Sequence, residues 1–314
     1  MIYTVTMNPA LDKTITVPDL SIDRVNRAAT VRQDPGGKGI NVAKVLTKLG
    51  VPCLAVGFTG GPAGQAVQQM LRLQRVPFEF LEVEGTTRTN LKIVDPVRHT
   101  NTDINEPGFA VTPALLEELL QQLLRRLQPG DLVVLAGSLP QGAPADTYGA
   151  WVRRCREAGA KVFLDADGEP LRRALAAGPY LVKPNAAELE RLAGRALPTE
   201  ADRIGAARAL FAQGVQKVVV SLGGEGALYL TPKEIWRARA VPVPVGSTVG
   251  AGDSMVAALA AAEQCGAGLE QAIRFSMAAG AANVMSSGTQ AAEKEQIESL
   301  MPRVKPERVG AENL

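Results

Sequence analysis

The stretch Ser247-Thr248-Val249-Gly250-Ala251-Gly252-Asp253-Ser254-Met255 is followed directly by an alanine-rich run from Val256 to Ala262. Two glycines within three residues allow a backbone to approach a ligand closely, and the alanine-rich run favours a helix behind the loop. The unpaired amides of a helix N-terminus, together with the helix dipole, bind anions such as phosphate. The stretch therefore predicts a phosphate-binding loop that opens a helix over 253–264.

Asp253 is the unusual residue of this loop, because a carboxylate beside a phosphate site repels the phosphate. One interpretation is that Asp253 caps the helix, a common role for aspartate. The other is that Asp253 takes a proton from a hydroxyl group as that hydroxyl attacks the phosphate. The loop alone favours the cap, and the rest of the chain favours the base.

Length and composition indicate one large α/β domain that acts on a small molecule. The 314 residues suffice for a large core, and a net charge of +2, from 34 basic and 32 acidic residues, gives no nucleic-acid or membrane signature. The single histidine, His99, excludes a histidine-based triad and argues against a multi-histidine metal site. A catalytic base is therefore sought among Asp, Glu, Lys and Tyr.

The cysteines and the N-terminus bear on the cellular compartment. Cys53, Cys155 and Cys265 lie far apart and form no CxxC motif, which indicates reduced thiols. The N-terminus has no basic segment, and no apolar run approaches the roughly 18 to 20 residues of a membrane span. We therefore expect a soluble, cytoplasmic protein.

The first third of the chain mixes core elements with polar strands. A strand is predicted at 2–7, and a turn that carries Asp12 follows it. A second strand is predicted at 54–58, and a helix that ends near residue 73 follows it. A second glycine-rich loop, 34–41, opens another helix. Short strands at 14–17 and 25–32 have no helix between them, and a polar hairpin covers 86–94 and 100–105. Together they could form a four-stranded sheet, which we interpret as a lid over about 13–33 and 87–106.

From residue 112 strands and helices alternate regularly, which predicts a parallel sheet between two helix layers. Strands are expected at 132–136, 162–165 and 218–221, and helices at 113–127, 145–158, 186–192, 199–212 and 269–285. Polar or flexible groups follow several strands, at 137–140, 165–167, 183–188 and 221–226. Since such strand ends meet at one edge, we expect an extended ligand site there. The polar tail from Lys305 is expected to fray.

Two glycine-rich signatures resemble those of the ribokinase/PfkB family of sugar kinases. They are Gly-Gly-Lys-Gly-Ile-Asn at 36–41 and Thr-Val-Gly-Ala-Gly-Asp at 248–253. Further stretches are similar to the phosphosugar branch, at 6–12, 37–46, 137–140, 183–189 and 247–256. The resemblance covers nearly the whole chain. It implies a ribokinase-like three-layer α/β/α sandwich, with a mostly parallel central sheet and a small β-sheet lid, as one domain over 1–314.

The resemblance also implies an activity, the Mg²⁺-dependent transfer of the γ-phosphate of ATP to a ketohexose phosphate. We expect the acceptor to be the C6 hydroxyl of fructose 1-phosphate, giving fructose 1,6-bisphosphate and ADP. The alternatives are tagatose 6-phosphate or fructose 6-phosphate as acceptor, and a non-catalytic sensor of sugar phosphate or nucleotide. A dinucleotide oxidoreductase is disfavoured, because the chain has no GxGxxG fingerprint.

Roles around the acceptor follow from the resemblance. Asp253 matches the general base, and the amides of Gly250, Ala251 and Gly252 match the anion hole. Other positions match residues that hold the sugar hydroxyls (Asp12, Gly37 and Asn41), residues near the sugar's phosphate (Lys38, Arg88 and Ser138), and a lid residue that reaches a neighbouring subunit (Arg27). We therefore expect a homodimer joined through the lids.

Roles around the nucleotide follow in the same way. The expected nucleotide-binding residues are Lys183, Ser221, Gly223, Gly226 and Thr248, with Asn283 near the adenine. Asn185 and Glu188 match the group that organises magnesium through water. Mg²⁺ keeps several waters and prefers oxygen ligands, so an Asn-x-x-Glu pair on one helical turn suits it. Phosphoryl transfer mainly needs positioning and charge neutralisation, which such a site supplies without histidine.

Overall fold

The computed structural model describes residues 1–286 and 290–310, which are built around one ten-stranded sheet. The strand order is β14-β13-β12-β11-β10-β9-β8-β1-β4-β5, and the strands from β5 to β11 run parallel while β12, β13 and β14 pair antiparallel. The strands are β1 Ile2–Thr6, β4 Cys53–Thr59, β5 Phe78–Glu82, β8 Leu132–Ala136, β9 Lys161–Asp165, β10 Leu181–Val182, β11 Lys217–Ser221, β12 Ala227–Leu230, β13 Ile235–Ala238 and β14 Pro306–Arg308.

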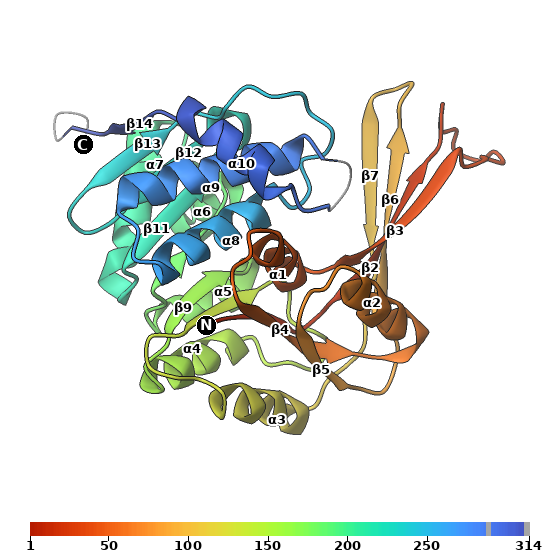
Figure 1. Ribbon diagram of the computed structural model, residues 1–314, viewed down its shortest axis with the longest axis horizontal. Helices are drawn as coiled ribbons and strands as arrows, with labels where there is room; N and C mark the ends of the chain where they lie inside the picture. The colour runs from red at the N-terminus through yellow and green to blue at the C-terminus, as the bar shows by residue number, and fades with distance from the viewer. Residues whose placement is uncertain (287–289, 311–314) are drawn as a thin grey trace.

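Helices cover both faces of this sheet (Figure 1), so the expected three-layer α/β/α architecture is confirmed. One face carries α1 Lys38–Lys48, α2 Gly61–Leu73, α8 Ala251–Gln264, α9 Leu269–Val284 and α10 Lys294–Leu300. The other carries α3 Pro113–Leu124, α4 Thr147–Glu157, α5 Gly168–Leu175, α6 Ala186–Ala193 and α7 Glu200–Ala209. Alternate residues of a strand serve the two layers: Leu132 and Val134 pack on the first, Val133 and Leu135 on the second.

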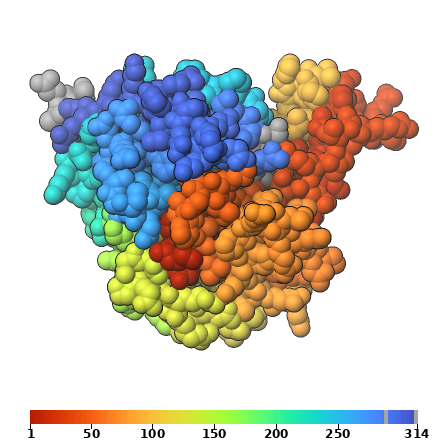
Figure 2. Space-filling model, viewed as in Figure 1, coloured from red at the N-terminus to blue at the C-terminus, as the bar shows by residue number. Residues whose placement is uncertain are grey.

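A separate four-stranded sheet projects from the body (Figures 1 and 2), with the order β3-β2-β6-β7. It consists of β2 Ala10–Thr16, β3 Thr30–Gly36, β6 Arg88–Asp95 and β7 Thr100–Asn105. At its tip the Asp95 carboxylate accepts hydrogen bonds from the amides of Asp19 and Leu20, at 3.0 and 2.8 Å. This carboxylate therefore ties the loop after β2 to the end of β6.

Three local predictions were wrong. Asp12 lies inside β2 and not in a turn, because β2 pairs with β3 on one side and with β6 on the other. The partner strand runs over Thr30–Gly36 and not 25–32, since the tip loop occupies the residues before Thr30. The tail does not fray over Pro306–Arg308, where β14 extends the main sheet beside β13. Strands β5, β12 and β13 and helices α5 and α10 were not anticipated.

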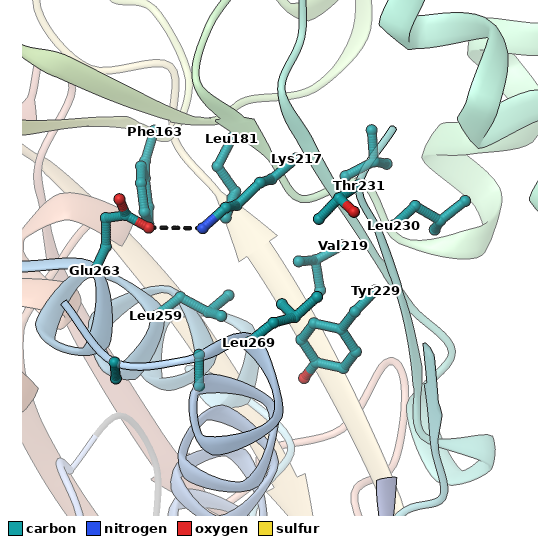
Figure 3. Close-up of a pocket in the computed structure, with 13 residues that line it drawn as sticks. Phe163, Leu181, Lys217, Val219, Tyr229, Leu230, Thr231, Leu259, Glu263 and Leu269 are labelled. Atoms are coloured by element: carbon teal, nitrogen blue, oxygen red, sulfur yellow. Dashed lines mark hydrogen bonds and ion pairs between the residues drawn. The ribbon is translucent and has the colours of Figure 1, made fainter. Parts of the chain in front are cut away.

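Helix α8 is fixed at its C-terminal end by Glu263, as Figure 3 shows. The Glu263 carboxylate accepts hydrogen bonds from Lys217 at 2.7 Å and from the Tyr180 hydroxyl at 2.7 Å, and it also pairs with Lys161. The Tyr180 ring stacks on Phe163 of β9 at a centroid distance of 6.0 Å. These contacts tie α8 to the amino ends of the strands, opposite the edge where the predicted site lies.

No helix within 1–286 or 290–310 is both long and apolar enough to cross a membrane. Cys53 and Cys155 are buried and Cys265 is exposed, all three as free thiols.

Candidate active site

A cavity of about 900 Å³ opens at the carboxyl edge of the parallel strands. The loops after β1, β8, β9 and β10, the end of β11, the first turns of α1 and α8, and the lid sheet (β2, β3, β6 and β7) all contribute to its wall. The predicted residues that line it are Asp12, Gly37, Lys38, Asn41, Arg88, Ser138, Lys183, Asn185, Glu188, Ser221, Gly250, Gly252 and Asp253. Residues from both signatures, far apart in the sequence, therefore meet in one cavity.

The first turn of α8 presents free amides to this cavity. Gly250 is the N-cap, with a φ of 81°, a left-handed conformation that glycine adopts without strain. Within residues 1–286 and 290–310 no side chain caps this helix end, and the Ala251 amide makes only a long contact of 3.5 Å with the Thr248 carbonyl oxygen, so the amides of this turn can turn to an anion. A Cβ on Gly252 would lie 3.1 Å from the Lys183 ammonium, which shows how closely a cation approaches this turn.

Asp253 does not cap α8. It is the third residue of the helix, and its Oδ2 accepts a hydrogen bond of 2.8 Å from Nδ2 of Asn41 on α1. The side chain is 7% exposed and lines the cavity. Burial raises the pKa of Asp253, the carboxylate of Asp165 raises it further, and Lys38 opposes both. A buried carboxylate with a raised pKa is a suitable general base.

Asp165, at the end of β9, forms the centre of a buried ion network. Its two carboxylate oxygens lie 2.8 Å from the Lys38 ammonium and 3.2 Å from the Lys183 ammonium. Burial raises the pKa of Asp165, but the two lysines outweigh burial and hold the pKa below its usual value. Asp165 therefore remains ionised and keeps both lysines at the cavity wall, where they can face phosphate oxygens.

The N-cap and the first turn of α1 need glycine because they pack directly on β1. A Cβ on Gly39 would lie 2.6 Å from the carbonyl oxygen of Val5. Gly37 has a φ of 111°, and a Cβ there would meet the Thr6 side chain at 2.6 Å. These close approaches bring the first turn of α1, with Lys38 and Asn41, to the end of β1.

The lid sheet places Asp12 at the cavity. Asp12 in β2 lies opposite Asn90 in β6, whose Nδ2 donates to its Oδ1 at 3.0 Å. A Cβ on Gly36 would lie 2.1 Å from Asp12 Oδ2, so the neighbouring strand leaves room for this carboxylate only by having no side chain. A fixed carboxylate of this kind can accept hydrogen bonds from sugar hydroxyls.

Arg88, Ser138 and Asn8 form a polar cluster at one end of the cavity. An Arg88 guanidinium nitrogen lies 3.3 Å from Ser138 Oγ and 3.1 Å from the Asn8 carbonyl oxygen. The Asn8 side-chain amide also donates to Ser138 Oγ, at 3.3 Å. The buried Nε of Arg88 has no protein partner within the described part of the chain. A guanidinium with an unused donor suits the oxygens of a phosphate group.

Asn185 and Glu188 form a complete capping box at the start of α6. Glu188 N donates to Asn185 Oδ1 and Asn185 N donates to Glu188 Oε2, both at 2.8 Å. The box engages one carboxylate oxygen of Glu188, and the side chain also lines the cavity beside Lys183. The donor set, one carboxylate and one amide oxygen, fits a magnesium ion that keeps most of its waters.

Several predicted residues lie outside this cavity. Arg27 is exposed in the lid tip loop, and Thr248 lines an adjacent cavity between the lid and the α8 loop. Gly223 and Gly226 form the turn after β11, where a Cβ on Gly226 would lie 2.0 Å from the Ala238 carbonyl oxygen. Asn283 is buried beneath Gly250, and Ala251 lies in the first turn of α8 without lining the cavity.

The sequence prediction missed further lining residues: Asn8, Asn90, Asn105, Asp165, Asp167, Gly168, Pro170 and Val249. Position at a strand end was the available signal for Asp165 and Asp167, but it assigns neither residue a role. Asn90 and Asn105 gave no such signal, because Asn90 depends on the pairing of β6 with β2, and Asn105 on the pairing of β7 with β6.

Comparison with known proteins gives consistent matches over nearly the whole chain. Residues 5–296 match the pfkB family carbohydrate kinases. The chain is 36% identical to the 1-phosphofructokinase of Bacillus subtilis, over 98% of this chain and 100% of that protein. It is 44% identical to the 1-phosphofructokinase of Xanthomonas campestris pv. campestris, over 82% and 83% of the two chains.

Among solved structures, phosphofructokinase-2 from Escherichia coli in complex with fructose-6-phosphate superposes with a TM-score of 0.90, at 31% identity, over 96% of this chain and 98% of that one. A tetrameric inhibited form of the same enzyme is similar as well.

Proposed function

Because the chain belongs to the pfkB family of carbohydrate kinases, with a ribokinase-like fold, we propose that it transfers the γ-phosphate of ATP to the C6 hydroxyl of fructose 1-phosphate. The products would be fructose 1,6-bisphosphate and ADP. The observation that carries this proposal is the cavity itself. It holds Asp253 and the free amides of α8 together with the Arg88 and Ser138 cluster, so it suits an acceptor that already bears a phosphate.

In this reaction the chain's own residues position the groups and move one proton. Asn41 engages Oδ2 of Asp253, which leaves Oδ1 to take the proton from the acceptor hydroxyl as its oxygen attacks the γ-phosphorus. The bond between the γ-phosphorus and the β–γ bridging oxygen of ATP then breaks, and ADP leaves. The amides of Gly250 to Gly252 bind the transferring phosphoryl oxygens.

Asp165 holds Lys38 and Lys183 at the cavity wall, where the two ammonium groups neutralise negative charge on the phosphate groups of the substrates. Asp12 and Asn41 orient the sugar through its hydroxyls. Asn185 and Glu188 would hold magnesium through water, and the ion would supply charge neutralisation on the ATP phosphates. Ser221 and the turn of Gly223 and Gly226 support the nucleotide. Thr248 lies beside the nucleotide, and Asn283 lies near its adenine.

The sheet of β2, β3, β6 and β7 acts in this proposal as a lid and as the surface of a homodimer. Apolar side chains are exposed on its strands, namely Val31 and Ile104, and on the loops at its tip, namely Ile22, Val25 and Val97. Covering such residues favours association with a second copy, which would bring Arg27 toward the partner's cavity. Light scattering should give twice the monomer mass at micromolar concentration. Val25→Asp combined with Val31→Asp should then give monomers.

A second candidate acceptor is fructose 6-phosphate, favoured by the solved complex of the similar Escherichia coli enzyme. A ketohexose phosphate presents a phosphate at one end and a hydroxyl at the other, so either isomer spans the same two groups. Tagatose 6-phosphate, phosphorylated at C1, is tested beside it.

The deciding experiment measures ADP release with ATP and magnesium against fructose 1-phosphate, fructose 6-phosphate and tagatose 6-phosphate, compared by kcat/KM. We expect a preference of at least a hundredfold for fructose 1-phosphate, about 2.7 kcal/mol of transition-state discrimination. A preference for a 6-phosphate would indicate that the sugar binds in the reverse orientation, with its C1 hydroxyl as the acceptor. Sugar-phosphate binding without ADP release from any of the three would identify a sensor.

A further inference from the structure

We infer that Lys44 is a positioning residue for the catalytic carboxylate: from behind the site, its ammonium fixes the Asn41 amide and stabilises the negative charge on Asp253. This inference rests on the proposed function for the role of Asp253 as base. It assigns a task to a buried charge that the phosphate-transfer chemistry itself does not use.

The geometry links three buried side chains in a row. Lys44 lies one helical turn after Asn41 on α1 and is 4% exposed. Its Nζ lies 3.3 Å from Asn41 Oδ1 and 3.2 Å from the Pro35 carbonyl oxygen. The other end of the Asn41 amide, Nδ2, donates to Asp253 Oδ2 at 2.8 Å. Asn41 therefore bridges an ammonium and a carboxylate.

The chemistry of the two ends decides the orientation of the amide. A lysine ammonium only donates hydrogen bonds and an ionised carboxylate only accepts them. Asn41 satisfies both partners only with its oxygen toward Lys44 and its NH₂ group toward Asp253. Lys44 therefore prevents the flipped amide, which would place an oxygen against the carboxylate and displace the base.

The charges around Lys44 determine how far its own charge reaches. Asp34 on β3 and Asp12 on β2 face it, along with Asp253 on α8 and the opposing cation Arg32. Burial lowers the pKa of Lys44 to about 8, although the three carboxylates favour the charged form. Lys44 is therefore mostly charged at neutral pH, and the charge lies one side chain away from Asp253.

A second cavity, of about 410 Å³, gives Lys44 its own contact with solvent. The described residues that line it are Asp34, Lys44, Lys48, Gln74, Val76, Gln290, Ala291 and Glu293, none of which lines the catalytic cavity. Lys44 can therefore exchange protons while substrate fills the active site.

The test compares Lys44→Met and Lys44→Arg with Lys48→Met. Lys48 lies one turn further along α1 and lines the same second cavity, but its side chain is 41% exposed and pairs with Glu293. For Lys44→Met we expect kcat to fall about tenfold through misplacement of the base. The acid limb of the kcat–pH profile should also move up by roughly half a pH unit or more. Lys44→Arg should keep the wild-type limb, and Lys48→Met should leave both values unchanged.

A readout without turnover separates this inference from the proposed function. Carbon-13 NMR of labelled aspartate carboxyls, with Asp253 assigned by its absence in Asp253→Asn, gives the pKa of Asp253 in each variant. We expect a higher pKa in Lys44→Met alone, with thermal unfolding confirming that every variant is folded. The inference is overturned if Lys44→Met leaves the Asp253 pKa unchanged, or if Lys44→Arg raises it equally. A wild type without kinase activity but with this pKa shift would refute only the proposed function.

Discussion

The side-chain amide of Asn41 donates a 2.8 Å hydrogen bond to the carboxylate of Asp253, across 212 residues of sequence. This bond joins the first turns of α1 and α8. Each of these turns belongs to one of the two glycine-rich signatures, at 36–41 and 248–253. Each helix alone would present an amide-rich end, and only their contact fixes a carboxylate beside those ends.

Replacing Asp253 by Asn should lower kcat by roughly a thousandfold with a modest change in KM for either substrate. Asparagine keeps the shape and the Asn41 contact but cannot take the acceptor's proton. Steady-state ADP release measures the effect, and Ser254→Ala, the next residue on α8, serves as control with near-normal turnover expected. Near-normal turnover of Asp253→Asn would eliminate the base assignment.

The same substitution should make the protein more stable at neutral pH, by about 1 to 3 °C in Tm. The pKa of Asp253 is raised in the folded state, chiefly by burial and then by Asp165. Ionised Asp253 therefore costs stability once the pH exceeds its unfolded-state pKa of about 3.9. The Tm gain of Asp253→Asn should grow from that pH upward and vanish below it. A Tm equal to wild type at every pH would contradict the raised pKa.

Asp165→Asn should have the opposite effect and lose about 3 kcal/mol of stability at neutral pH, because it leaves Lys38 and Lys183 without their counter-charge. The pKa of Asp165 is lowered, since the two lysines outweigh burial, so its contribution is present above the unfolded-state pKa. That contribution is lost as the pH falls through the folded-state pKa. Denaturant unfolding at several pH values measures it, with Asp146→Asn as control, because Asp146 is exposed and its side chain makes no cap hydrogen bond to α4 within the described residues.

Much of this arrangement could be predicted because it depends on local signals. The glycine loop before Asp253 and the apolar strands with polar ends indicated the sheet, its helix layers and the edge that carries the site. Family membership, confirmed by the match over residues 5–296, extended this to individual positions. The helix predicted over 253–264 is α8, Ala251–Gln264. A four-stranded sheet was predicted from 14–17, 25–32, 86–94 and 100–105, and its strands lie at 10–16, 30–36, 88–95 and 100–105.

What could not be predicted depends on pairing between distant segments. Asn90 reaches the cavity only because β6 pairs with β2 in the register that sets Asn90 opposite Asp12. The tail strand β14 forms because β13 offers an edge, and its own sequence, Pro-Glu-Arg, has no strand signature. The burial of Lys44 likewise arises from the approach of β3 to α1, since an exposed lysine would be the default on a helix.

Arg88→Ala should raise KM for the sugar phosphate by about tenfold or more while leaving KM for ATP unchanged, because a charge-assisted phosphate contact is worth about 1.5 to 3 kcal/mol. Arg88→Lys should recover only part of the loss, since lysine lacks the planar fork. The exposed lid-tip variant Arg98→Ala is the control. An equal rise in both KM values would contradict a direct contact between Arg88 and the sugar's phosphate.

Glu263→Gln should separate stability from catalysis. Glu263 lies at the C-terminal end of α8, where it pairs with Lys217 (Figure 3), whereas Asp253 lies in the first turn of the helix. Burial opposes the charge, but hydrogen bonds from Lys161, Lys217 and Tyr180 outweigh it and lower the pKa of Glu263 to about 2. The stabilisation, about 1 kcal/mol after solvent screening, should be present above the unfolded-state pKa of about 4.3 and disappear as the pH falls toward 2. Thermal unfolding against pH measures it, with Glu270→Gln on the exposed surface of α9 as control. Since the N-terminal turn of α8 is held separately by Asn41, the acid limb of kcat should stay at its wild-type position. A shift of that limb in Glu263→Gln would show that the helix transmits the loss from one end to the other.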